Sequence, residues 1–221
     1  MKLRYKKLVI IISVATLVLG FFILTLIPTG KGGNDASSAS LELTDNEEIK
    51  TLIQDYFTAK KNVDMDAFST IVSDVSQLNR AKLTAMAAYV EDYQNIECYV
   101  IEDEQNGGCR VYVKYDLKMK NIDTLAPSLS AFYLTNTSDN KYVIYLSALD
   151  EVQEDFINSA DENEAVVNLE NDVQKAMNDA INSDPVFKQL YQRMDQGIRS
   201  VSGSAVSGSV AGVATGTAAG A

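Results

Sequence analysis

The first 28 residues constrain this chain more than any other segment does. An uncharged run of twenty residues from Leu8 to Ile27 ends at Pro28, and four cations precede it: Lys2, Arg4, Lys6 and Lys7. A helix of twenty residues, rising about 1.5 Å per residue, matches the hydrocarbon core of a bilayer, about 30 Å thick. Cations flanking such a run stay in the cytoplasm. We therefore predict a single-pass anchor in the cell membrane, with a cytoplasmic N-terminus and an extracellular domain.

A cleaved secretory signal is the alternative interpretation of the same run. Signal peptides have an apolar core of about 7 to 15 residues with a small-residue cleavage site close behind. The run here is longer, and the nearest such site, Ser37 to Ala39, lies well downstream. An uncleaved anchor is therefore the favoured prediction, and cleavage stays open.

Charge and composition exclude several classes of function. All 30 acidic residues but only 15 of the 19 basic residues follow Ile27, so this part is strongly acidic and is predicted not to bind nucleic acid. The chain contains no histidine, which excludes Ser-His-Asp and Cys-His catalytic sites. We predict no cofactor and no metal. The acidic run of Asp161, Glu162 and Glu164 is interpreted as a solvated helix start.

Composition also predicts the domain organisation. Residues 29–43 are rich in Gly, Ser and Ala and read as a flexible linker. Residues 44–150 have the length of one compact domain. Residues 151–200 carry helical patterns. Residues 201–221 have only small, uncharged side chains and Val, and are predicted to be disordered.

Three helices are predicted at the start of the compact domain. Thr44 and Glu47 fit a capping box. Apolar residues then follow at helical spacing: Ile49, Leu52, Ile53, Tyr56 and Phe57. Asp64 can cap a second helix, which carries Phe68, Ile71 and Val72. Met86 and Val90 indicate a third helix from about Leu78 to Tyr93.

Alternation of period two then predicts antiparallel strands. Apolar residues alternate with polar ones on both sides of Asn106-Gly107, a strong hairpin signal. A two-residue loop there would pair Cys98 with Tyr115 and would leave Cys98 too far from Cys109 for a disulfide. Residues 128–136 and 141–149 form a second predicted pair. Helices against a curved four-stranded antiparallel sheet make the fold class α+β.

The residues after Asp150 predict a helical tail. Five apolar residues step by three and four, as in a coiled-coil seam: Val166, Leu169, Val173, Ala176 and Ala180. Ser183-Asp184-Pro185 predicts a helix restart, with a cap followed by proline at the first helical position. The resulting hairpin would lean on its own domain or on a partner.

The order of these elements, with Tyr56-Phe57 on the opening helix, resembles the nuclear transport factor 2-like (cystatin-like) superfamily over residues 45 to about 150. Residues 89–99 and 120–127 are similar to membrane-anchored extracytoplasmic proteins of Firmicutes with a helical tail and no assigned activity. The resemblance implies a cone of about three helices on a curved sheet. The superfamily includes ketosteroid isomerase, non-catalytic binding and scaffold domains, and extracytoplasmic domains of conjugation and secretion assemblies.

Functional expectations follow from these patterns. The leading hypothesis is a non-enzymatic, membrane-anchored extracytoplasmic binding or scaffold module that docks a protein partner or itself as a homodimer. One alternative is a component of a cell-envelope conjugation or secretion assembly. Another is a small-ligand binder or isomerase-like enzyme, which would need Tyr56 beside a carboxylate such as Asp116 or Asp123. The candidate binding residues are Tyr56, Asn121, Asp123, Pro127, Phe132 and Tyr133.

Overall fold

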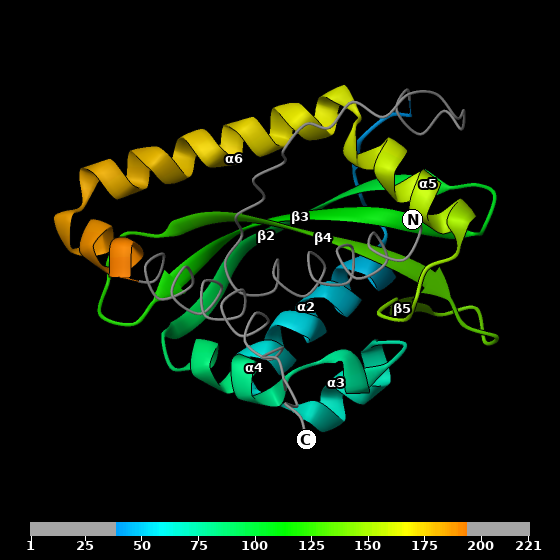
Figure 1. Ribbon diagram of the computed structural model, residues 1–221, viewed down its shortest axis with the longest axis horizontal. Coiled ribbons are helices and arrows are strands. Elements are labelled where there is room, and N and C mark those ends of the chain that lie inside the picture. The colour runs from blue at the N-terminus through cyan, green and yellow to red at the C-terminus, as the bar shows by residue number, and fades with distance from the viewer. Residues whose placement is uncertain (1–38, 194–221) are drawn as a thin grey trace, which may run out of the picture. The chain divides into compact units, whose positions relative to one another are not determined.

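The computed structural model describes residues 39–193 (Figure 1). The chain divides into two compact units, of which the first runs through Ala180 and the second begins at Ile181. The predicted anchor (1–28) and the small-residue tail (201–221) lie outside the described residues. Between residues 39 and 193, no helix has the length and apolar character needed to cross a membrane. The sheet and the residues that pack on its two faces belong to the first unit.

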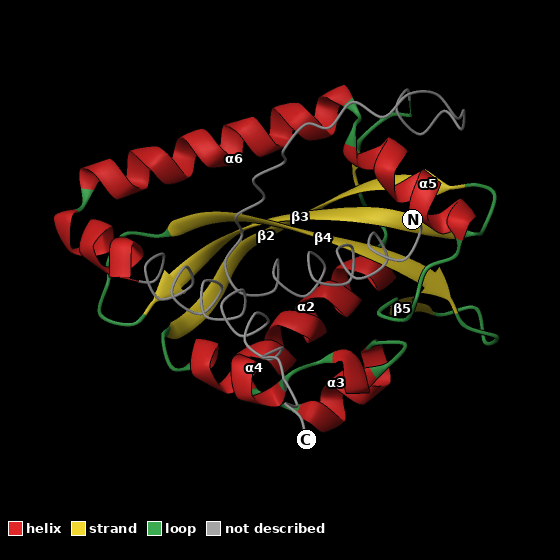
Figure 2. Ribbon diagram, in the orientation of Figure 1, coloured by secondary structure: helices red, strands yellow, loops and turns green. Residues whose placement is uncertain are grey.

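Five antiparallel strands form one sheet in the order β1-β2-β3-β4-β5 (Figure 2). Their bounds are Glu42–Leu43 (β1), Val90–Asp103 (β2), Gly108–Met119 (β3), Ala126–Asn136 (β4) and Tyr142–Ile144 (β5). The α+β class and the antiparallel sheet are confirmed. The short β1, pairing Leu43 with Tyr99, adds a fifth strand to the predicted four. The strand predicted over 141–149 is shorter, because β5 ends at Ile144.

The hairpin between β2 and β3 differs from the prediction by two residues. Its loop is four residues long, because Asp103 pairs with Gly108. The Asp103 carboxylate accepts hydrogen bonds from the backbone N–H of Gln105 (3.2 Å) and of Asn106 (3.2 Å), which stabilises the wider turn. Gly107 takes the left-handed conformation (φ 66°) that glycine adopts without strain.

This register pairs Cys98 with Val113 rather than with Tyr115. From Glu97 to Asp103 the shift of two residues leaves the side chains on their predicted faces, because side chains alternate with a period of two. Irregularities between Gln94 and Glu97 and between Val90 and Asp92 change the register further along β2. Cys98 and Cys109 are both free and buried, which confirms that they form no disulfide.

Helices α2 (Glu47–Asn62) and α3 (Met65–Ile71) follow the predicted spacing. The cap of α2, however, is Asn46 and not Thr44. The Asn46 side chain accepts from the backbone N–H of Glu48 (2.9 Å), while the Thr44 hydroxyl accepts only from the N–H of Asn46 (3.1 Å). Asp64 caps α3 as predicted.

The third helix is shorter than predicted. A 3-10 turn, η2 (Val75–Gln77), precedes α4 (Arg80–Ala87), and Val90 already belongs to β2, where it pairs with Met119. The apolar residues at 89–93 fit either helix or strand locally. Pairing with β3 decides for the strand, because cross-strand contacts outweigh the weak local preference.

The sheet has a core on each face. On the first, which we call the α2 face, α2 and α3 pack against the strands through a cluster that includes Ile49, Ile53, Tyr56, Phe57, Phe68, Val111, Val113, Phe132 and Leu134. On the second, the α5 face, helix α5 (Glu151–Asp161) and the start of α6 (Glu164–Ser183) cover the strands. The members of that cluster are Ile101, Tyr112, Tyr133, Phe156, Ala160 and Val166. The tail therefore begins by packing on its own sheet.

The predicted helix restart of the tail is confirmed, and the predicted seam is confirmed in part. Val166 and Val173 are buried, but Met177 replaces Ala176 as the next buried residue, because an α-helix repeats every 3.6 residues. Helix α6 ends at Ser183. The Asp184 carboxylate then caps the next helical segment, accepting from the N–H of Val186 at 2.8 Å.

Candidate functional site

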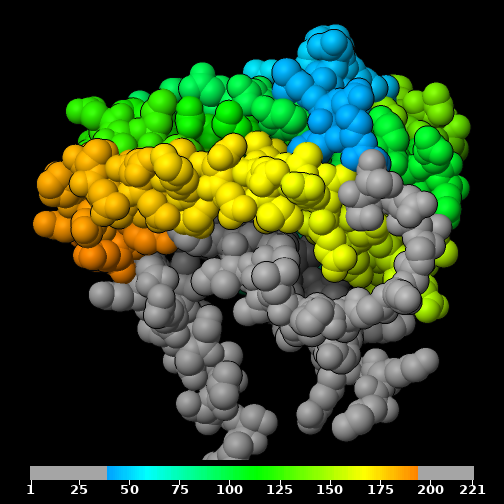
Figure 3. All heavy atoms as spheres, turned by 90° about the horizontal axis from the view of Figure 1, so that it is seen from above, coloured from blue at the N-terminus to red at the C-terminus, as the bar shows by residue number. Residues whose placement is uncertain are grey.

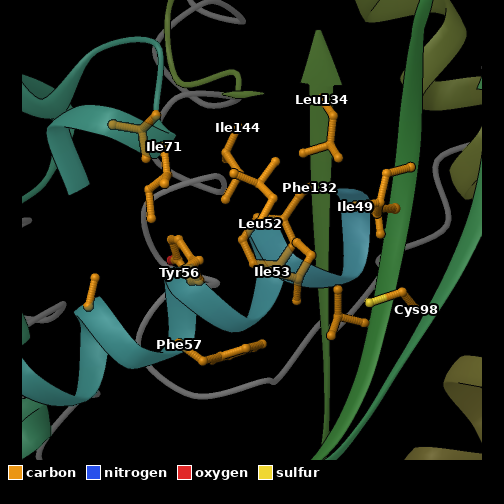
Figure 4. Packing of buried hydrophobic residues seen from close by; sticks show 14 of the residues in the cluster. Ile49, Leu52, Ile53, Tyr56, Phe57, Ile71, Cys98, Phe132, Leu134 and Ile144 are labelled. Carbon is orange, nitrogen blue, oxygen red and sulfur yellow. The ribbon is translucent and has the colours of Figure 1, made fainter. Parts of the chain in front are cut away.

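Two of the six predicted site residues meet in the core of the α2 face. The rings of Tyr56 on α2 and Phe132 on β4 lie 4.9 Å apart between centroids, at an interplanar angle of 69° (Figure 4). Tyr56 also contacts Phe57 and Phe68 at 5.6 and 5.5 Å. These edge-to-face contacts are typical of a packed aromatic core.

Tyr133 lies on the opposite face of the sheet from its neighbour Phe132, because successive strand residues point to opposite sides. Its hydroxyl donates to the Asp103 carboxylate at 2.8 Å, and its ring packs near Phe156 at 6.1 Å. Tyr133 thus belongs to the α5-face core.

The other three predicted residues lie on the connection from β3 to β4 and at the start of β4. Asn121 is exposed in a left-handed turn (φ 62°), and Pro127 is half-buried in β4. Asp123 is fully exposed, 3.7 Å from the Lys118 ammonium. The six residues therefore lie in three separate places rather than in one site.

The pairing that an isomerase would need is not formed. Tyr56 is fully buried, whereas Asp123 is in solvent. The alternative base, Asp116, accepts a hydrogen bond from the side-chain amide of Asn95 at 2.7 Å.

A buried cation that the sequence analysis did not single out lies on the α2 face. Lys60 of α2 is only 5% exposed. Its Nζ lies 5.9, 5.7 and 5.5 Å from the ring centroids of Tyr56, Phe57 and Tyr93. We call these three rings the aromatic enclosure. The sequence spacing could have indicated that Lys60 faces these rings, since residues three and four apart share a helix face and Lys60 follows Phe57 and Tyr56 at those distances.

The electrostatics of Lys60 are unusual. Burial lowers the pKa of Lys60 to about 8. Over residues 39–193, no carboxylate lies within ion-pair distance of its Nζ. Its neighbour Lys61 is the ordinary case, being half-exposed and 2.9 Å from an Asp92 oxygen. The rings thus offer Lys60 cation–π attraction without an anion.

The α5 face holds a different polar centre. Arg110 of β3 forms a bidentate ion pair with Asp161 at the end of α5, at 2.9 and 3.0 Å. The Tyr112 hydroxyl donates to the same carboxylate at 2.6 Å. We call these three residues the clamp. It corrects the interpretation of Asp161 as a solvated acid, which holds only for the exposed Glu162 and Glu164.

The pKa of Glu170 on α6 depends on the charges of the clamp. Burial, together with the nearby Asp161 carboxylate, raises the pKa of Glu170 to about 7, although the Arg110 charge opposes the shift. The clamp therefore fixes the end of α5 to the sheet and leaves beside it a carboxyl group that titrates near neutrality.

A small groove of about 160 Å³ separates α2 from α3, and its lining includes Asp55, Asn62 and Asp64. In the part of the chain that the structure describes, no three acidic or cysteine side chains are placed to hold a metal ion. The groove is too small for a drug-sized ligand, since such ligands occupy about 300 to 1,000 Å³.

Comparison of the chain with protein-family models, with curated proteins and with solved structures finds no match. Function is therefore argued from the geometry of the α2 face, the clamp and the tail.

Proposed function

We propose that the chain is a membrane-anchored extracytoplasmic scaffold module that docks a protein, either a partner or a second copy of itself. In this proposal residues 44–150 form a nuclear transport factor 2-like cone that serves as a rigid support. The helical tail presents the docking surface. The anchor over residues 1–28 holds the module at the outer side of the cell membrane.

The observation that carries the proposal is the filling of the α2 face. The Phe57 ring lies 4.6 Å from that of Tyr93 and 4.7 Å from that of Tyr115. Tyr56 and Phe132 continue the same cluster (Figure 4). A cone enzyme would hold its substrate in this space. Because packed rings occupy it, the recognition of another protein is left to the outer surface.

The clamp supports a docking role for the tail. It ties the end of α5 to β3 across 51 residues of sequence, and the second core packs Phe156 and Val166 beneath the tail. A helix held in this way presents its outer residues at fixed positions, which lowers the entropic cost of binding. In Figure 3 the part of α6 that belongs to the first unit lies on the face turned toward the viewer.

The segment that precedes β1 is held at the turn between α5 and α6. The Asn163 side-chain amide, in the turn between α5 and α6, donates to the carbonyl of Ala39 at 2.7 Å. Ala39 follows Pro28 by eleven residues, so the linker can reach at most about 40 Å. The proposal therefore places the start of α6 near the membrane, where it would meet other envelope proteins.

Photo-crosslinking of the full-length protein in its native membrane tests the proposal. A photoreactive amino acid replaces Asn168 or Asn171 on the exposed side of α6, and Ser69 or Thr70 on α3 as matched exposed controls. We expect a discrete crosslinked species from the α6 positions, with a mass that separates a partner from a second copy. Equal crosslinking from both helices, or none from α6, would contradict docking through the tail.

A further inference from the structure

The docking proposal leaves the buried amine of Lys60 without a role, and the inference drawn from it does not depend on docking. Lys60 is buried and no carboxylate of the described residues pairs with it, although a lysine ammonium is normally kept in water or paired. An apolar position that only needed filling could be occupied by Leu or Met without desolvating a charge. Its environment is instead of the kind that makes a lysine nucleophilic, because desolvation in an apolar site favours the neutral amine.

The amount of neutral amine sets the reactivity. With a pKa of about 8, about one Lys60 side chain in ten is neutral at pH 7, whereas an ordinary lysine at 10.5 is neutral in about one molecule in 3,000. Lys61 has a different environment, because its exposed ammonium lies 2.9 Å from an Asp92 carboxylate oxygen. The two adjacent lysines thus differ in burial and in their partners.

The aromatic enclosure suits one class of product. A protonated imine is a cation at the position of the former ammonium, so the rings of Tyr56, Phe57 and Tyr93 can attract it as they attract the ammonium. Rings that exclude water also favour loss of water from the carbinolamine. A neutral product such as an acylated amine, or an anionic one such as a carboxylated amine, would not gain this attraction.

We propose that Lys60 is a covalent attachment site for small, uncharged aldehydes or ketones. The neutral Nζ attacks the carbonyl carbon and forms the C–N bond, while the carbonyl π electrons move to oxygen. Proton transfer from nitrogen to that oxygen gives a carbinolamine. Loss of one water then gives the imine, with no change of oxidation state. The site takes compounds of only a few heavy atoms, because Lys60 is 5% exposed and the rings surround it.

Reductive trapping tests the site in the full-length protein. The chain is incubated with limiting propanal and cyanoborohydride, which reduces each imine to a stable secondary amine, and peptide mass spectrometry measures labelling at every lysine. We expect Lys60 to be labelled at least about tenfold faster than Lys61 at pH 7.5. Because cyanoborohydride reduces the protonated imine and becomes slower as the pH rises, the titration midpoint is measured separately by brief acetylation with limiting acetic anhydride. The rate of acetylation of Lys60 should rise to a plateau around a midpoint of about pH 8. Pyridoxal phosphate, which is bulky and anionic, should label Lys61 and leave Lys60 unmodified.

Two variants separate reactivity from simple packing. Tyr93→Phe keeps the ring and should keep both the selectivity and the midpoint. Tyr93→Ala opens the enclosure to water, so the midpoint should move toward that of an ordinary lysine and the selectivity should fall several-fold. Labelling of Lys60 by propanal no faster than that of Lys61 would overturn the proposal. A midpoint that stays the same in Tyr93→Ala would overturn the role of the enclosure.

Discussion

The two faces of the sheet bury charge in opposite ways. On the α2 face, Lys60 lies among three rings with no anion from residues 39–193 within ion-pair distance, and its pKa falls to about 8. On the α5 face, the Arg110 side chain is 11% exposed, meets Asp161 in two hydrogen bonds and stays charged. The comparison teaches that burial alone does not decide the state of a charge. A fixed partner turns a buried cation into a structural link, whereas its absence leaves a group that titrates.

The largest expected effect comes from breaking the clamp. Asp161→Ala leaves the Arg110 guanidinium buried without its anion, and we expect a loss of about 3 kcal/mol in the free energy of unfolding. Urea unfolding of the purified full chain, followed by circular dichroism, measures it. The double variant Arg110→Met/Asp161→Leu removes both charges and should recover most of the loss. A double variant as unstable as the single one would show that the ion pair is not the cause.

The α2 face should respond in the opposite direction. Lys60→Met keeps the length of the side chain and removes a desolvated charge, so the free energy of unfolding at pH 7 should rise by about 2 kcal/mol. Lys61→Met serves as the control and should change stability by less than about 0.5 kcal/mol. A Lys60→Met protein less stable than wild type would mean that cation–π attraction outweighs desolvation.

A pH series sharpens the same comparison. The folded pKa of Lys60 is lowered to about 8, so between about pH 8 and 10.5 the unfolded chain binds more protons at this residue than the folded chain does. Stability should therefore rise with pH across that window. Unfolding of the wild type and of Lys60→Met at pH 8, 9 and 10 isolates this contribution. The difference between the two proteins should shrink steadily as the pH increases.

The smallest effect is expected beside the clamp, at Glu170. Its folded pKa is raised to about 7, so between about pH 4.5 and 7 the folded chain binds more protons than the unfolded chain does, and stability should fall as the pH rises. Glu170→Gln should remove this fall. The gain at pH 8 should stay below about 1 kcal/mol, because solvent screens a half-exposed group. Thermal melts at pH 5 and pH 8 measure it, and equal pH slopes in both proteins would contradict the assignment.

Features that depend on near neighbours could be predicted from the sequence. Helical spacing located Tyr56 and Phe57 on the buried side of α2, and alternation placed Cys98 in the core. The hairpin register could not be predicted from spacing alone, because the Asp103 carboxylate organises the loop through hydrogen bonds to the residues after it. A two-residue loop and a four-residue loop keep the same faces, so periodicity could not choose between them.

The two polar centres were missed for different reasons. Lys60 lies at a spacing that faces the core, but lysine is normally a surface residue, so its residue type predicts exposure rather than burial. Asp161 lies in an acidic run, and its partner Arg110 is 51 residues earlier, beyond the reach of any local pattern. The six predicted binding residues are separated for a third reason. Neighbours in a strand, such as Phe132 and Tyr133, belong to different cores.

The bond between Asn163 and Ala39 gives the molecule a defined response to mechanical load. A pull on the linker first loads this hydrogen bond and the packing of Ala39 and Leu41 on the α5-face core, and then the two-residue pairing of β1 with β2. The longer strand pairings of β2 with β3 and of β3 with β4 lie beyond those contacts. They carry no load until the earlier contacts have broken. The first segment of the domain can therefore detach and extend before the rest of the domain unfolds. It yields under tension while the sheet and the clamp stay intact.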